Sequence, residues 1–148
     1  MSIDFESLDK GAPIDGLSIP ALTRVTLARF AGASDDYNPV HLDDKGAAAT
    51  GKPSVFAPTT LIMGYVGRMV ERWLVGAALK RFELKVVRLV WPGDVLTCRG
   101  TIIDKREEDG AYIIDADISA DNQRGENVAN GLIIAVVPKS PGKALSPK

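Results

Sequence analysis

The chain's only histidine, His41, lies in the polar segment SDDYNPVHLDD, which covers residues 34–44. It follows Asp36 by five residues, with Asn38 and Pro39 between them. An imidazole can exchange a proton near neutral pH, and a neighbouring carboxylate can help it to hold and activate water. Because Pro39 prevents a continuous helix across the pair, an extended turn would have to bring the two side chains together. The segment is therefore a candidate acid–base site.

Two other interpretations fit the same residue types. Asp and Asn bond their own backbone and proline fixes φ, so the segment also has the composition of an ordinary structural turn. A metal site is the third possibility, but the segment lacks the additional His or Cys residues of zinc sites and the spacing of a calcium loop. Its ligands would be Asp36, His41, Asp43 and Asp44. On residue types alone, the structural turn is the simplest interpretation and the metal site the weakest.

The composition is that of a single globular domain. The 148 residues are 45% hydrophobic and 25% charged, and the net charge is −1, so no overall field favours nucleic acid or an anionic membrane. No segment approaches the roughly 20 apolar residues of a membrane span. We expect one domain over residues 1–137 and a flexible tail over residues 138–148, which are rich in Pro, Lys and Ser.

Cysteine usage and the N-terminus favour the cytoplasm. Cys98 is the only cysteine, so no internal disulfide is possible and a reducing compartment fits. The acidic N-terminus has no signal-peptide pattern. Cys98 lies in an expected strand, and we interpret it as a small buried residue rather than a nucleophile.

The first half of the chain is predicted to be helical or irregular. Thr23 can cap a helix over residues 24–34, and Asp43 can cap another over residues 44–50. Residues 59–76 are expected to form a long, buried central helix, in which the apolar residues follow helical spacing. These residues are Ile62, Val66, Met69, Val70 and Trp73.

Two glycines are unusual in that central helix. Gly64 and Gly67 each cost about 1 kcal/mol relative to alanine. A close strand, a second subunit or a ligand would compensate, and close packing is the simplest explanation.

The second half is predicted to form four long antiparallel strands, over residues 81–91, 95–107, 111–120 and 126–137. The last strand ends in an apolar run, which indicates an inner position in the sheet. The fold class is therefore α+β, with an antiparallel sheet wrapped around a long helix. Such a sheet has an exposed edge, which pairing with a second subunit would protect.

The string LARFAGASDDYNPVHLDD, residues 27–44, resembles the signature of the MaoC-like dehydratases, also called (R)-specific enoyl-CoA hydratases. That family carries Gly-Asp-(Phe/Tyr)-Asn-Pro-(Ile/Leu/Val)-His after a short helix, then His-Gly-Met before a long central helix. A later Pro-Gly-Asp turn is also common in the family and is present here at residues 92–94. The resemblance covers residues 17–137.

The resemblance implies a hotdog fold, a dimer joined at its sheet edges, and reversible hydration of trans-2-enoyl thioesters to (R)-3-hydroxyacyl thioesters. It implies that Asp36 and His41 form the catalytic dyad and that Asn38 and Pro39 support the loop. No separate cofactor is implied, because CoA or an acyl carrier protein is part of the substrate. The partner chain would be a second copy or a different hotdog subunit.

The chain departs from the family pattern near the central helix. Pro58-Thr59-Thr60 replaces His-Gly-Met, whose glycine N–H would bind the thioester oxygen. We expect Thr59, Thr60 and Gly64 to line the oxyanion and substrate site. The β-branched Thr59 could crowd this site or exclude a φ that glycine accepts. An unusual substrate or weak activity would follow. Asp35 also replaces the glycine that precedes the catalytic aspartate.

Other functions stay open at this point. The altered 58–60 segment is compatible with a non-catalytic or half-active subunit of a hotdog heterodimer. A hotdog thioesterase would also use a carboxylate and water, and a binding module would need no chemistry. Five cations around the first two long strands could meet CoA phosphates or an acidic carrier: Lys80, Arg81, Lys85, Arg88 and Arg99.

Overall fold

The computed structural model describes residues 3–138, so the expected tail lies almost entirely outside the described residues. Five strands form one antiparallel sheet in the order β1-β3-β4-β5-β2. The helices are α1 (Arg24–Ser34), α2 (Pro39–Leu42), α3 (Asp44–Ala49) and α4 (Thr59–Trp73). The strands are β1 (Pro13–Ile19), β2 (Ala78–Val86), β3 (Leu96–Glu108), β4 (Ala111–Asn122) and β5 (Asn127–Val137).

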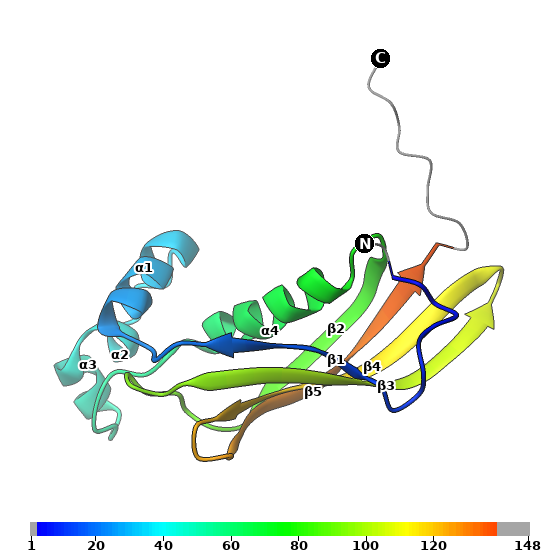
Figure 1. Cartoon of the computed structure of the whole chain (residues 1–148). Helices are drawn as coiled ribbons and strands as arrows, with labels where there is room; N and C mark the ends of the chain where they lie inside the picture. The colour runs from blue at the N-terminus through cyan, green and yellow to red at the C-terminus, as the bar shows by residue number, and fades with distance from the viewer. Residues whose placement is uncertain (1–2, 139–148) are drawn as a thin grey trace.

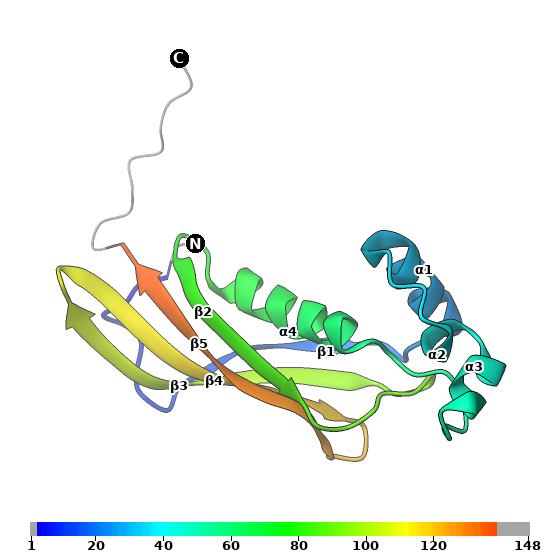
Figure 2. The same cartoon turned by 180° about the vertical axis from the view of Figure 1, so that it is seen from behind.

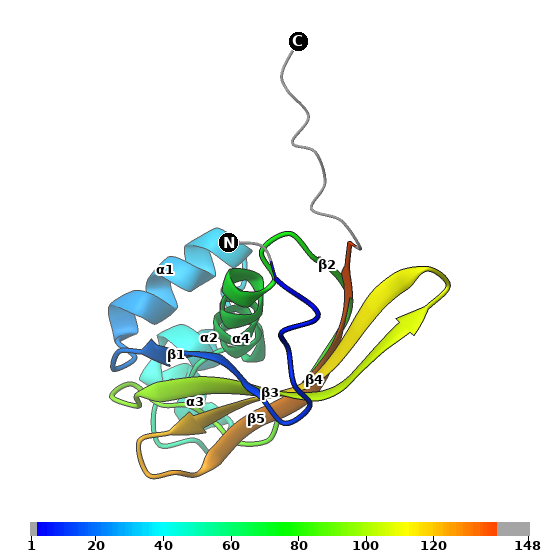
Figure 3. The same ribbon diagram turned by 45° about the vertical axis from the view of Figure 1, so that its right-hand side comes forward.

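The sheet curves around α4, which lies along its concave face (Figures 1 and 3). The three shorter helices gather beyond one end of the sheet, where α4 begins, and the β3–β4 hairpin projects at the other end (Figures 1 and 2). This arrangement confirms the predicted α+β class and the hotdog fold. The shorter helices and the start of α4 are therefore placed together at one end of the molecule.

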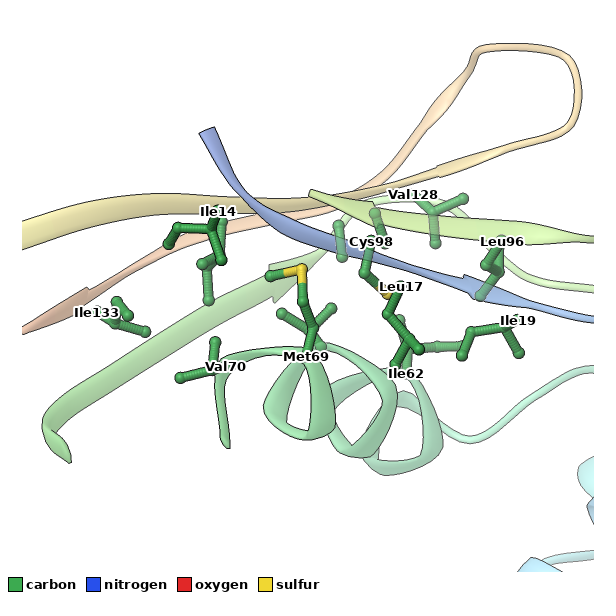
Figure 4. Close-up of a cluster of buried hydrophobic side chains, with 14 of the residues drawn as sticks. Ile14, Leu17, Ile19, Ile62, Met69, Val70, Leu96, Cys98, Val128 and Ile133 are labelled. Carbon is green, nitrogen blue, oxygen red and sulfur yellow. The ribbon is translucent and has the colours of Figure 1, made fainter. Parts of the chain in front are cut away.

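The core forms between one face of α4 and the sheet. Ile62 and Met69 of α4 point toward the sheet near Leu17 and Ile19 of β1, and Val70 lies toward Ile133 of β5 (Figure 4). Each of these six side chains is buried, and full burial of such a side chain contributes about 1.5–3 kcal/mol. The predicted apolar spacing of the central helix is thus confirmed. The helix ends at Trp73 rather than residue 76, because a turn with Gly76 at φ 83° follows.

The close-packing explanation for Gly64 and Gly67 is wrong. A Cβ at either position would have no heavy atom of residues 3–138 within 4 Å, apart from its own helix and chain neighbours. Gly64 is exposed and Gly67 half-buried. The two glycines therefore leave an open surface on α4 that none of the five described strands covers.

Two strand predictions need correction. The first half of the chain is predicted to be helical or irregular, but residues 13–19 form β1. The apolar alternation of β1 is interrupted at Asp15 and Gly16, where its pairing with β3 carries a register shift between Ile14 and Leu17. The expected strand over residues 81–91 ends at Val86. The next residues cross the sheet, because β2 pairs with β5 whereas β3 pairs with β1 and β4.

The hairpins and the inner strand agree with the sequence. Asp109 and Gly110 have φ values of 51° and 78° in the β3–β4 turn, as two-residue hairpins require. β5 lies between β4 and β2, which confirms its inner position. The strands at the two edges of the sheet are β1 and β2.

Candidate active site

The acid–base segment starts where α1 ends. α1 has the predicted bounds, and Thr23 caps it by accepting a hydrogen bond from the Thr26 amide at 3.0 Å. Asp35 follows in the left-handed conformation, with φ 58°. Glycine adopts this conformation without steric cost, and aspartate tolerates it better than most residues do. The position therefore requires a residue that tolerates a positive φ. Asp35 does so and adds an exposed carboxylate.

Asn38 and Pro39 build the short helix that carries His41. The Asn38 side chain accepts a hydrogen bond from the Val40 amide at 3.3 Å, and Pro39 is the first residue of α2. Proline suits this position because its missing N–H needs no partner. The His41 amide donates to the Asn38 carbonyl at 3.0 Å. Asp43 then caps α3, as predicted, by accepting from the Lys45 amide at 3.2 Å.

Asp36 and His41 face each other across a short gap. Asp36 Oδ2 lies 3.9 Å from His41 Nε2, which is too far for a direct hydrogen bond but close enough for both atoms to contact one water. The His41 side chain is 11% exposed and that of Asp36 37% exposed. Asp36 Oδ1 accepts from the Asn38 amide at 3.3 Å. The structure thus brings together the two residues that the sequence paired.

The contact of the second imidazole nitrogen, Nδ1, determines which nitrogen of His41 carries the hydrogen. His41 Nδ1 lies 2.7 Å from the Phe56 carbonyl oxygen. A carbonyl only accepts hydrogen bonds, so Nδ1 must carry the hydrogen and a neutral ring keeps its lone pair on Nε2. That lone pair is on the nitrogen nearest Asp36. The Phe56 carbonyl has no sequence signal, because any residue type can supply it.

Aromatic rings hold the imidazole from the side. Phe56 meets His41 edge to face, with centroids 5.0 Å apart at 83°. Trp91 meets Phe56 in the same way at 5.9 Å and 73°. Such contacts restrict the rotation of a ring. The orientation of His41 is therefore fixed by a hydrogen bond and by packing together.

The start of α4 is linked to His41 through Phe56, because the residue whose carbonyl contacts the imidazole precedes Thr59 by three residues. Thr59 and Thr60 are exposed, and no side-chain hydrogen bond caps the helix within the described residues. The first amides of a helix lack intrahelical partners and attract negative charge. Thr59 has no positive φ, so its backbone does not require glycine. The expected conflict with φ is therefore absent, and only side-chain crowding remains.

Cys98 lies in the core, and several of the cations considered for CoA form ion pairs with carboxylates. Cys98 is fully buried, and burial raises the pKa of its thiol to about 11. Three of the five cations considered for CoA form ion pairs, namely Arg81 with Glu83, Arg88 with Glu126, and Arg99 with Asp121. Among residues 3–138, no three His, Cys, Asp or Glu side chains are arranged to hold a metal ion.

Two hollows lie away from Asp36 and His41. One of about 180 Å³ lies between β1 and the end of α4, beside Asp15 and Arg72. The other, of about 600 Å³, lies over β3, β4 and β5, beside Arg99 and Asn130. Neither is lined by residues of the acid–base segment. No helix within residues 3–138 has the length and apolar character to cross a membrane.

Comparison with known families supports the assignment made from the sequence. The sequence model of the MaoC like domain matches residues 10–123. The chain belongs to the MaoC-like dehydratase family. The matched region includes the acid–base segment, α4 and most of the sheet.

Other proteins share this MaoC-like fold. The UPF0336 protein of Thermobifida fusca is 29% identical over 78% of this chain and 82% of its own length. The R-hydratase PhaJ1 of Pseudomonas aeruginosa has a TM-score of 0.82 at 23% identity, covering 99% of this chain and 95% of its own. A chain of the ChsH1-ChsH2 complex from Mycobacterium tuberculosis has a TM-score of 0.74 at 22% identity, covering 87% and 98%. The two structures, at these identities, show the shared fold.

Proposed function

We propose that this MaoC-like chain adds water reversibly to trans-2-enoyl thioesters and forms (R)-3-hydroxyacyl thioesters. The observation that carries the proposal is the arrangement of Asp36 and His41, with 3.9 Å between Oδ2 and Nε2 and the far side of the imidazole held by the Phe56 carbonyl. Membership of the family supports the same reaction class. CoA or an acyl carrier protein would arrive as part of the substrate, and no separate cofactor is needed.

The pair would activate one water molecule. His41 Nε2 and Asp36 Oδ2 both accept hydrogen bonds, so a water between them can donate to each. As the water oxygen bonds to C3, the pair takes a proton and negative charge moves to the thioester oxygen. The same proton then reaches C2, which balances the reaction. In dehydration these steps run in reverse. A positioned acid or base typically contributes roughly 10²- to 10⁴-fold.

The start of α4 would stabilise the charged intermediate. The Thr59 amide is the group that corresponds to the family's oxyanion donor, and a helix N-terminus favours negative charge. If the Thr59 side chain crowds this position, Thr59→Gly should raise the rate on crotonyl-CoA several-fold. Unchanged or lower activity would indicate that Thr59 and Thr60 shape the pocket for a different acyl group.

The exposed face of α4 would receive the acyl chain or a second subunit. Gly64 presents open space there, and β2 lies at an edge of the sheet. A second hotdog chain, identical or different, would cover both. The similarity to one chain of a two-protein complex and the altered residues 58–60 keep a heteromeric subunit as the second candidate. The single unpaired cysteine supports a cytoplasmic setting.

The first experiment is a hydration assay on crotonyl-CoA and on longer and branched 2-enoyl-CoAs. Loss of the conjugated-thioester absorbance in the wild type, but not in Asp36→Asn, is the expected result. Absence of turnover on every substrate would favour the heteromeric subunit, which should copurify with another hotdog chain.

A thiol reagent added to the same assay distinguishes hydration from thioester hydrolysis. Hydrolysis would release a free thiol, whereas hydration releases none. Because the chain's only thiol, Cys98, is buried with a raised pKa, the folded protein should add little background signal.

A further inference from the structure

The Phe56 carbonyl that fixes His41 belongs to a segment held on both sides. The Ala57 amide donates to the Val90 carbonyl at 2.8 Å, on the side toward α4. On the other side, the Val55 amide donates to Asp44 Oδ1 at 3.2 Å. The first attachment is between backbone groups. The second depends on one side chain, so a substitution can remove it.

Asp44 connects three parts of the site. Its carboxylate accepts two hydrogen bonds from Arg24 Nη2, at 2.8 and 2.9 Å, which ties α3 to α1. It also accepts from Ser54 Oγ at 3.1 Å, and Arg24 itself reaches Ser54 at 3.2 Å. Asp44 therefore holds residues 54 and 55 immediately before the carbonyl that His41 uses.

The same short stretch of chain meets this segment twice. His41 contacts Phe56, and Asp44, three residues later, contacts Val55. With both contacts in place, the carbonyl cannot shift relative to the imidazole without breaking a hydrogen bond. Without Asp44, only the Ala57–Val90 hydrogen bond on the far side and the His41 contact itself would oppose that movement. Hydrogen bonding from Arg24 lowers the pKa of Asp44, so Asp44 remains an acceptor at neutral pH.

The Arg24–Asp44 ion pair is expected to add little to the overall stability of the fold. The Arg24 and Asp44 side chains are 53% and 55% exposed, and exposed ion pairs contribute little to the free energy of unfolding. Their contacts instead converge on the segment that supports His41. A local effect on the ring is therefore the more direct consequence of the arrangement.

We infer that Asp44, held by Arg24, is a positioning residue that keeps the Phe56 carbonyl aimed at His41 and so fixes the Nδ1–H tautomer. Its effect on turnover rests on the proposed hydration. Its effect on His41 does not depend on any reaction. Asp44 would act through the Val55–Phe56 peptide and would not touch the substrate.

The test is to read the tautomer of His41 directly. Because the chain has one histidine, nitrogen NMR of the labelled imidazole gives a single set of signals. The wild type should show the hydrogen on Nδ1. Asp44→Ala should move the ring toward a mixture of tautomers and lower kcat about tenfold, with KM nearly unchanged. Asp44→Asn, whose amide oxygen can still accept from Val55, should restore the wild-type tautomer and most of kcat.

Glu108→Ala is the matched control. Glu108 is 55% exposed and pairs with Arg106 in the β3–β4 hairpin, at the opposite end of the sheet (Figure 1). It should leave both the tautomer and kcat unchanged. Arg24→Ala should change both in the direction of Asp44→Ala, by less, and provides the same test if Asp44→Ala does not fold.

The outcomes separate this inference from the proposed reaction. A wild-type tautomer in both Asp44→Ala and Arg24→Ala would overturn the positioning role. A changed tautomer in a protein whose wild type hydrates no enoyl thioester would leave the role of Asp44 standing and remove the proposed reaction.

Discussion

Asp36 and Asp94 lie in two short turn-forming segments of the chain, but their oxygens are used differently. Asp94 is 5% exposed and accepts from the Trp91 amide at 2.9 Å, from Gln123 Nε2 at 3.0 Å and from Arg124 Nη1 at 3.3 Å. Asp36 is partly exposed and accepts one bond, at 3.3 Å, within the described part of the chain.

The difference separates a structural carboxylate from one available for chemistry. Three donors surround the Asp94 carboxylate, and through them it joins the 91–94 turn to the turn between β4 and β5. Asp36 keeps lone pairs free beside an imidazole nitrogen, where a water can bind. Residue type alone gives no such distinction, because both segments have turn-forming compositions.

The largest expected effect is on activity and comes from substitutions of Asp36 and His41, the pair that is available for chemistry. Asp36→Asn and His41→Ala should each lower kcat/KM for 2-enoyl-CoA by about 10²- to 10⁴-fold, because each removes a positioned proton acceptor. Initial rates measure the loss, and circular dichroism should show an unchanged fold. Asp35→Asn is the control, since Asn also tolerates the left-handed conformation. Full activity in both site variants would refute the dyad assignment.

The next effect is on stability and concerns the structural carboxylate. Asp94→Ala should lower the free energy of unfolding by about 1–3 kcal/mol, because it leaves the part-buried Trp91 amide without its acceptor and removes the contacts to Gln123 and Arg124. Denaturant unfolding measures the change. Asp94→Asn keeps one oxygen acceptor and should cost less than the alanine variant. An Asp94→Ala protein as stable as the wild type would mean that solvent replaces the lost contacts.

A smaller, pH-dependent effect comes from Cys98 in the core. Burial raises the folded-state pKa of its thiol to about 11, above the ordinary value of 9.0. Between these values the unfolded chain loses the proton first, so the native state binds more protons and stability falls as pH rises. Near pH 10 the loss should be about 1 kcal/mol relative to pH 8.

The variant Cys98→Ala isolates this contribution. Its free energy of unfolding should be lower by a constant amount below pH 9, and the difference from the wild type should shrink as pH rises toward 11. The variant must be compared with the wild type at each pH, because burial also raises the pKa of Tyr65. That shift lowers the free energy of unfolding at high pH in both proteins. A difference that does not change with pH would place the thiol in a more polar environment.

Local signals made part of this fold predictable. Thr23 and Asp43 are capping residues, and the helices that follow them begin where predicted. β1 was not predicted, because Asp15 and Gly16 interrupt its alternation of apolar and polar residues at a register shift. The sheet order was not predicted either, since alternation shows which residues face the core but not which strands pair. The end of β2 was missed because apolar residues continue to Val90, whose carbonyl bonds Ala57 instead of a strand.

The candidate site also has a part that the sequence predicts and a part that it does not. Asp36 and His41 could be proposed from residue types and a family signature. The contact that fixes His41 could not, because it uses a backbone carbonyl of Phe56 fifteen residues away. Asp44 was weighed only as a metal ligand. Its contacts with Arg24 and Val55 depend on how α1, α3 and the segment before α4 pack.

The smallest expected effect concerns two helical glycines with the same local surroundings. Gly32 in α1 and Gly64 in α4 are both exposed, and within the described part of the chain a Cβ at either would meet nothing within 4 Å beyond its own helix and chain neighbours. Alanine at either position should therefore stabilise the folded chain by up to about 1 kcal/mol through helix propensity. Thermal or denaturant unfolding of the two variants measures this gain.

Activity should separate the two glycines. If the acyl chain or a second subunit covers α4, Gly64→Ala should lower turnover, most strongly for long or branched substrates, whereas Gly32→Ala should leave it unchanged. Initial rates across acyl lengths, with the oligomeric state measured by light scattering, show whether substrate fit or subunit association is affected. Equal activity in both variants would mean that Gly64 takes no part in the substrate or subunit surface. A loss confined to Gly64→Ala would explain why a central helix keeps a glycine that its own sheet does not require.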